Sequence, residues 1–122
     1  MTTVTPTYNS ARGGNGSVKE WVFAITTANL NGSPIEFPDW YDRVWVATGT
    51  FGSATLAIQG SADGTNWVTL NDVNGNAATL TADGHRHVQA TPRFMRPFLT
   101  VAGSGAAITV TCLARRPTDI RV

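Results

Sequence analysis

The chain has few of the residues that build reactive or strongly charged sites. Among its 122 residues there is one cysteine, Cys112, and one lysine, Lys19, and only 14% of the residues are charged. A single cysteine excludes an intrachain disulfide and a thiolate-based metal cluster. The formal net charge of +1 supplies no strong field. We therefore expect no nucleic acid as a main partner, because such binding depends on clustered cations.

Long apolar runs are also absent. No run approaches the roughly 20 residues that span a bilayer, so we expect no membrane partner. Residues 1–20 lack the charged segment followed by an apolar one that marks a secretory signal. The chain is nevertheless 42% hydrophobic, and a domain of this length can bury roughly two-thirds of its extended-chain surface. These values predict one compact, soluble domain.

The two ends differ in composition from the centre. Residues 1–17 consist mainly of Gly, Ser, Thr and Asn, and such a segment buries too little surface to offset the entropy cost of ordering. We interpret residues 1–17 as a flexible N-terminal arm, residues 18–116 as the folded domain, and residues 117–122 as a C-terminal tail that starts at Pro117.

The centre reads as strands separated by turns. In residues 54–61, for example, Leu56 and Ile58 alternate with Thr55, Ala57 and Gln59, the period-two pattern of a strand with one buried side. Turn residues recur every eight to twelve positions, which is typical of a sandwich or a barrel. We expect an all-β, antiparallel β-sandwich of jelly-roll type. Its strands are expected over about residues 20–28, 43–50, 54–61, 67–72, 78–81, 86–90, 94–101 and 106–116.

The octet "GSADGTNW", Gly60 to Trp67, connects two of these strands. Asp and Gly tolerate positive φ, so the Asp63-Gly64 pair provides the chemistry of a tight reversal. The octet is therefore expected to be a hairpin connection.

Two segments carry a resemblance to a known fold. The pattern S-x-D-G-x-x-W, from Ser61 to Trp67, resembles the hairpin of discoidin-like (coagulation factor 5/8 C-type) jelly rolls and related carbohydrate-binding modules. The segment "RFMRPFLTV", Arg93 to Val101, resembles the arginine-aromatic-x-arginine strand of the same folds. The resemblance covers residues 54–114 and implies that Trp67 packs into the sandwich core. The chain lacks the end-closing cysteines and ligand-binding loops of discoidin domains, so lipid or sugar binding is not carried over.

A second resemblance concerns function. The short all-β build, the low-complexity arm, the Thr/Gly/Ala-rich strands and the single cysteine resemble small structural proteins of tailed-bacteriophage virions, among them capsid decoration (cement) proteins. This resemblance implies a non-enzymatic protein on the outer surface of the virion head, made in the host cytoplasm. It would bind the major capsid protein or other virion proteins and form a homo-oligomer, for which we expect a trimer.

One segment has metal-like spacing. On a strand, His85 and His87 lie on one face about 7 Å apart, with Asp83 in register. The chain has no other histidine, and a site at a turn edge would be open. We therefore expect a solvated or interfacial strand here, and no metal or other cofactor.

The sequence also lacks a recognisable catalytic group. Cys112 is in register with Ile108 and Val110, so it is expected to be a small buried hydrophobic residue rather than a thiolate. No serine lies in a nucleophile-elbow pattern, and the acids Asp63 and Asp72 have a sufficient role in turns. We expect no enzymatic activity.

Two groups of residues are candidates for an interface. Aromatic residues in a proline-bounded loop would cap one end of the sandwich or contact another subunit. Arginines near both ends would be solvated or would pair with carboxylates of a neighbour. The alternative function, a carbohydrate-binding module of a phage tail or baseplate, would use Trp40 and Tyr41 to stack on sugar rings. The interface candidates are Arg12, Phe37, Trp40, Tyr41, Arg115, Arg116 and Arg121.

Overall fold

The computed structural model describes residues 3–4, 7–12, 18–36, 41–88 and 92–115, and all regular structure in these residues is β-strand. One sheet has seven strands. Five follow the order β1 (Thr3–Val4), β4 (Asn31–Gly32), β11 (Phe94–Val101), β7 (Thr55–Ser61) and β8 (Val68–Thr69), while β5 (Ile35–Glu36) pairs with β11 and β9 (Thr79–Leu80) pairs with β7. The second sheet has five strands in the order β10 (Gly84–Val88), β6 (Tyr41–Thr50), β12 (Ala107–Arg115), β3 (Val18–Thr26) and β2 (Thr7–Arg12).

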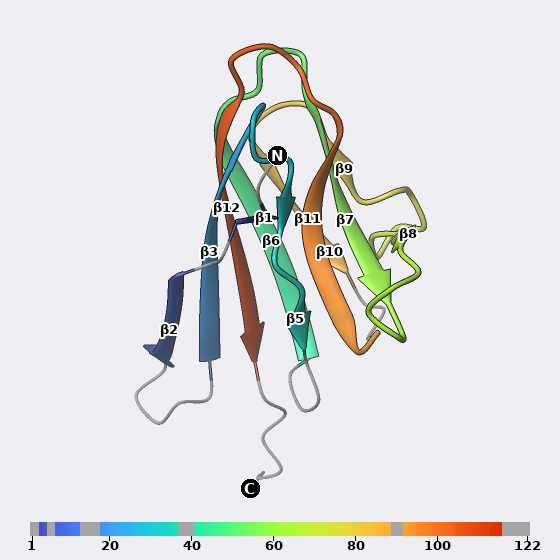
Figure 1. Cartoon of the computed structure of the whole chain (residues 1–122). Helices are drawn as coiled ribbons and strands as arrows, with labels where there is room; N and C mark the ends of the chain where they lie inside the picture. The colour runs from blue at the N-terminus through green and yellow to red at the C-terminus, as the bar shows by residue number, and fades with distance from the viewer. Residues whose placement is uncertain (1–2, 5–6, 13–17, 37–40, 89–91, 116–122) are drawn as a thin grey trace, which may run out of the picture.

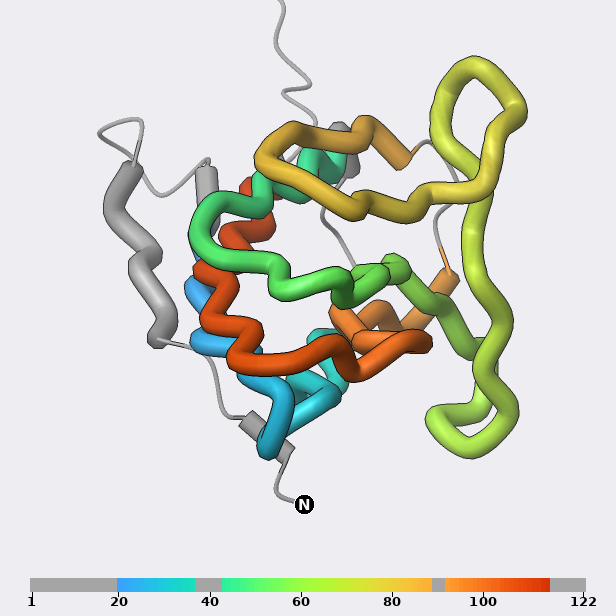
Figure 2. The backbone as a smooth tube through the Cα atoms, turned by 90° about the horizontal axis from the view of Figure 1, so that it is seen from above, coloured from blue at the N-terminus to red at the C-terminus, as the bar shows by residue number. Residues whose placement is uncertain are grey.

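The two sheets pack against each other and confirm the predicted antiparallel β-sandwich. Among the described residues, all strand pairs are antiparallel except β1 with β4. The long strands β3, β12 and β6 run side by side, and β11 and β7 lie beside them in the other sheet (Figure 1). Seen from above, the segment between β7 and β9 passes along one side of the sandwich, away from β3 and β12 (Figure 2). The jelly-roll connection stays a prediction. None of the described residues forms a helix long and apolar enough to cross a membrane.

Each of the eight predicted strands overlaps an observed strand, while β1, β2, β4 and β5 were not predicted. The strand expected over residues 94–101 has the same bounds in β11, and the one expected over residues 106–116 corresponds to β12. The short strands are the least well placed. The strand expected over residues 67–72 contains only β8 and an isolated bridge between Asn71 and Ala77.

The core lies between the sheets and is made by alternate residues of the long strands. Phe23 of β3 and Trp45 of β6 are fully buried, and their rings stack with centroids 6.3 Å apart. From β12, Val110 lies opposite Phe23, and Cys112 lies opposite Trp45. From the other sheet, Leu56, Ile58, Met95 and Leu99 join the same buried cluster. Alternation in both sheets therefore builds one continuous apolar layer.

One charged side chain is buried in this layer. Arg43 of β6 is only 1% exposed, and its Nη1 donates hydrogen bonds to the carbonyl oxygen of Pro92, at 3.1 Å, and to the sulfur of Met95, at 3.3 Å. Because a buried cation is costly unless it is hydrogen-bonded, these contacts fix the side chain in place. Arg43 thereby links the five-stranded sheet to β11 of the seven-stranded sheet.

The prediction that β7 has one buried side was wrong, because both of its faces are buried. Ala57 and Gln59, on the face away from the core, are 0% and 9% exposed. Their cross-strand partners on β11 are Phe98 and Arg96. These long side chains cover the shorter ones of β7, so polar or small residues are buried outside the core as well.

The segment expected to be an arm contains two strands. Thr7–Arg12 forms β2, the edge strand that pairs with β3, and Thr3–Val4 forms β1, which pairs with β4 in the other sheet. Composition alone misses such strands, since an edge strand gains backbone hydrogen bonds from a sheet that already exists.

The stacked Phe23 and Trp45 rings give the first prediction. Phe23→Ala leaves a cavity in the centre of the core and should lower the free energy of unfolding by about 3–5 kcal/mol. Urea unfolding followed by circular dichroism measures this loss. Thr81→Ala, at an exposed position between β9 and β10, is the control and should change stability by less than about 0.5 kcal/mol. A loss below about 1 kcal/mol for Phe23→Ala would contradict this account of the core.

Candidate functional site

The octet Gly60 to Trp67 forms the connection between β7 and β8, as predicted. Gln59 and Gly60 of β7 pair antiparallel with Thr69 and Val68 of β8. Within the turn, Gly64 has a φ of 78°, the left-handed region that favours glycine. The octet is therefore a structural turn.

Asp63 organises this turn through its carboxylate. Its Oδ1 accepts hydrogen bonds from the backbone amides of Thr65 and Asn66, at 2.8 and 2.9 Å, and from the Ser61 hydroxyl at 2.9 Å. Its Oδ2 accepts one from the Asn66 side-chain amide at 2.8 Å. The backbone donors of Asn66 and Thr65, followed by the side chains of Asn66 and Ser61, hold the pKa of Asp63 well below its ordinary value. A carboxylate with so many local partners is a structural group.

Trp67 does not pack into the core, so that expectation was wrong. It is half-buried and lies outside the core cluster. Val68 pairs with Gly60, whose other partner is the core residue Met95. Because side chains alternate along a strand, the preceding residue Trp67 points to the outer face of the seven-stranded sheet.

On this outer face Trp67 contacts Arg96. The guanidinium carbon of Arg96 lies 4.2 Å from the centroid of the Trp67 ring and 5.1 Å from that of Phe98. Its Nε donates a hydrogen bond to Oε1 of Gln59 at 2.9 Å. Burial lowers the pKa of Arg96, because the rings exclude water from the cation. The guanidinium is therefore held in one orientation by two rings and one amide.

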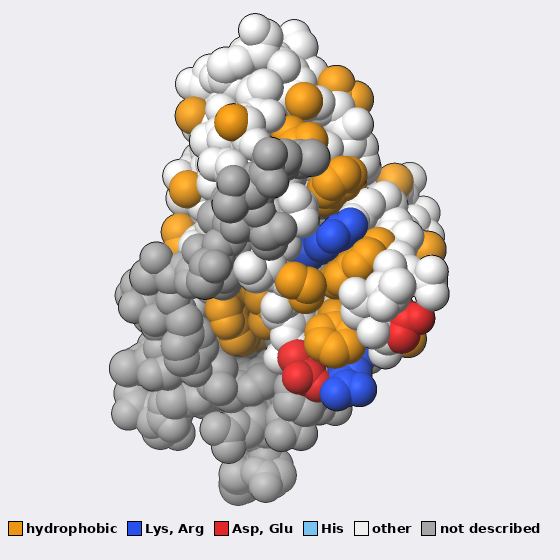
Figure 3. Space-filling model, in the orientation of Figure 1, with side chains coloured by type: hydrophobic (Ala, Val, Ile, Leu, Met, Phe, Trp, Pro, Cys, Tyr) orange, Lys and Arg blue, Asp and Glu red, His pale blue; other side chains and the backbone are white. Residues whose placement is uncertain are grey.

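A second arginine lies on the same face. The guanidinium carbon of Arg93 is 5.0 Å from the centroid of the Phe94 ring, and its Nε lies 2.6 Å from Oε2 of Glu36 on β5. In the space-filling view, hydrophobic side chains lie between separated basic groups, one of them beside an acidic group (Figure 3). We call Trp67, Phe94, Phe98, Arg93 and Arg96 the aromatic-arginine surface.

The outer face of the five-stranded sheet has a different character. Val44 and Val46 of β6, Val22 of β3 and Leu113 of β12 all lie on the face away from the core, and each is half-buried. Thr111 lies between Val22 and Val46 in the cross-strand register. We call these five residues the valine face. A solvated antiparallel sheet normally presents polar residues outward, so this face has the composition of a covered surface.

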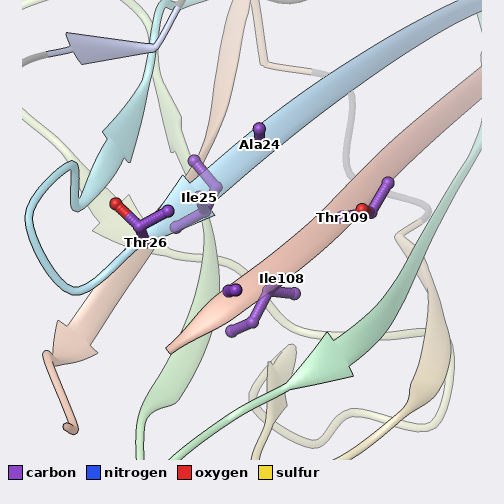
Figure 4. A pocket seen from close by; sticks show the side chains of 6 residues that line it. Ala24, Ile25, Thr26, Ile108 and Thr109 are labelled. Atoms are coloured by element: carbon purple, nitrogen blue, oxygen red, sulfur yellow. The ribbon is translucent and has the colours of Figure 1, made fainter. Parts of the chain in front are cut away.

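A shallow hollow continues the valine face toward the ends of β3 and β12. It has a volume of about 130 Å³ and is lined by small or β-branched residues of adjacent strands, among which Ala24 lies opposite Thr109 (Figure 4). Its lining contains no charged side chain. The lining residues are Ala24, Ile25, Thr26, Ala107, Ile108 and Thr109.

The structure brings together two of the residues predicted to form an interface. Tyr41, the first residue of β6, is the cross-strand partner of Arg115, the last residue of β12. Arg12 ends β2 opposite Val18, at the far edge of the same sheet. The other candidates, Phe37, Trp40, Arg116 and Arg121, lie outside the described residues.

The histidine pair lies on β10 at the edge of the five-stranded sheet. His85 and His87 are the partners of Val46 and Val44, so they border the valine face. Asp83 accepts a hydrogen bond from the backbone amide of Gly49 at 2.9 Å. Within the described part of the chain, no group of three His, Cys, Asp or Glu residues is arranged to hold a metal ion.

Cys112 is fully buried, as its place on the strand predicted. Burial raises the pKa of its thiol, and the nearby charge of Arg43 opposes this only in part. The thiol is therefore protonated at neutral pH and acts as a small apolar core residue.

No family model matches the chain, and no curated protein matches it.

The Asp63 turn generates a pH-dependent prediction. Since the folded state lowers the pKa of Asp63, its carboxylate stabilises the fold fully above about pH 4, and this contribution is lost as the pH falls toward the folded-state pKa. Asp63→Asn keeps an oxygen acceptor but cannot ionise. The stability difference between the native chain and Asp63→Asn, measured by urea unfolding, should be larger at pH 6 than at pH 2. An equal difference at the two pH values would contradict this role.

Proposed function

We propose that this β-sandwich is a non-enzymatic structural protein of a phage virion, a capsid decoration protein that acts through protein contacts. The observation that carries the proposal is the valine face. Four aliphatic side chains and one threonine cover the three central strands of the five-stranded sheet on the side away from the core.

The sequence of β6 shows why this face favours assembly. Trp45 and Ala47 point into the core, and Val44 and Val46 point outward, so the strand is apolar on both sides. Such two-sided strands are typical of sheets covered on both faces. Burying β-branched residues on a flat sheet costs little side-chain entropy, which suits a contact repeated many times on a lattice.

The proposed occupant of the valine face is a second copy of the chain, within a trimer. The five residues of the valine face carry no charge, Glu20 lies beside Leu113 at its edge, and the adjoining hollow over β3 and β12 would take an apolar side chain from the neighbour. In a cyclic trimer the contact is heterologous, so the valine face of one copy meets a different surface of the next, and an apolar contact of this kind needs no paired charges. The trimer would then sit on the head surface and contact capsid subunits through its remaining faces.

Val46→Arg tests the proposal, because it places a charge at the centre of the valine face while the core residues stay unchanged. The native chain should have about three times its monomer mass of 13.0 kDa by light scattering, and Val46→Arg should be monomeric. Thr81→Arg, at an exposed position outside the valine face, is the matched control and should remain trimeric.

The virion role is tested separately by sedimenting the protein with heads purified from the phage that carries its gene. The native chain and Thr81→Arg should sediment with heads, and Val46→Arg should not. A monomeric native chain that stays in solution and is retained on a polysaccharide column would instead support the carbohydrate-binding alternative.

A further inference from the structure

The two arginines of the aromatic-arginine surface differ in whether a carboxylate lies beside the guanidinium. Arg93 is neutralised by Glu36, whose carboxylate lies 2.6 Å from its Nε. Arg96 has no carboxylate among the described residues as a partner, and its hydrogen-bonded neighbour is the neutral amide of Gln59. Both arginines lie over aromatic rings of the same sheet face. The first difference between them is therefore the carboxylate beside Arg93.

Arg96 is also the more desolvated of the two. Its guanidinium is packed between the rings of Trp67 and Phe98, and burial lowers its pKa. The Arg93 side chain is 63% exposed. Arg96 is therefore partly desolvated with no anion beside it, and a carboxylate from a partner would offset this loss of water.

The contacts of Arg96 leave one edge of its guanidinium available. Nε is used by Gln59, and the described residues provide no acceptor for the two terminal amino groups. A guanidinium held flat by two rings loses little side-chain entropy when it binds a ligand. Its fork of donors matches the two oxygens of a carboxylate.

We propose that Arg96 binds a carboxylate of an acidic protein partner on the outer face of the seven-stranded sheet. This inference rests on the geometry of that face and holds whether or not the proposed virion role is correct. A carboxylate is the ligand of choice because only one net positive charge is available there, Arg93 being paired with Glu36. The flanking rings of Trp67 and Phe98 would cover the apolar part of a glutamate or aspartate side chain.

The test is a titration of the ¹⁵N-labelled full chain with a capped hexaglutamate peptide, followed by the NMR signal of the Arg96 Nε–H group. A capped hexaglutamine peptide is the matched ligand control. We expect a saturable shift with hexaglutamate and none with hexaglutamine. Inorganic phosphate should bind more weakly than hexaglutamate. The absence of a saturable shift, or tighter binding of phosphate, would overturn the proposal.

Variants identify the arginine responsible. Arg96→Met should weaken hexaglutamate binding at least about tenfold, the loss expected for a charge-assisted hydrogen-bonded pair. Arg96→Lys keeps the charge without the fork and should weaken binding by a smaller factor. Arg93→Met removes the same charge from the same face and leaves Glu36 unpaired, so it should weaken binding by a smaller factor than Arg96→Met does. Equal losses in Arg93→Met and Arg96→Met would overturn the proposal, since binding would then follow net charge alone.

Discussion

The structure depends on the position of β12 between β3 and β6. Because β12 pairs with a long strand on each side, alternate residues of three neighbouring strands point to the same side of the sheet. One set, with Phe23, Trp45 and Val110, makes the core. The other set, with Val22, Val46 and Thr111, makes the valine face. The register that builds the core therefore also fixes the composition of the outer surface, and neither can shift without the other.

The two outer faces of the sandwich offer different kinds of contact. The valine face is apolar and uncharged at its centre, which suits a broad and dry contact with another copy. The aromatic-arginine surface is built of rings and cations and presents a single oriented guanidinium at Arg96. Such a surface suits a localised polar contact. Under the proposed function, copies would contact each other through one sheet and a different partner would bind the other.

Much of the fold could be predicted from the sequence, because period-two alternation in long strands directly reflects burial. The strand over residues 94–101 and the turn at Asp63-Gly64 are examples. The candidate site was less predictable. Trp67 was expected in the core because of the resemblance to discoidin-like hairpins, but a tryptophan beside a turn carries no sign in the sequence of which sheet face it will take. The segment "RFMRPF" predicts a strand of the sandwich. Only the pairing of β11 with β7 shows that Arg96 contacts Gln59 and Trp67. The valine face could not be predicted, because "RVWVAT" indicates a strand but does not indicate whether its outer side is covered.

The central claim is that the valine face is covered when the protein assembles. The most direct measurement is the broadening of methyl NMR signals by a soluble paramagnetic agent, with the methyl groups of Val22, Val44, Val46 and Leu113 compared with those of the exposed Val68 and Val101. The account predicts that Val68 and Val101 are broadened in the assembled protein while the four valine-face residues are protected. Broadening of the valine-face methyl groups to the same extent as Val101 would contradict it.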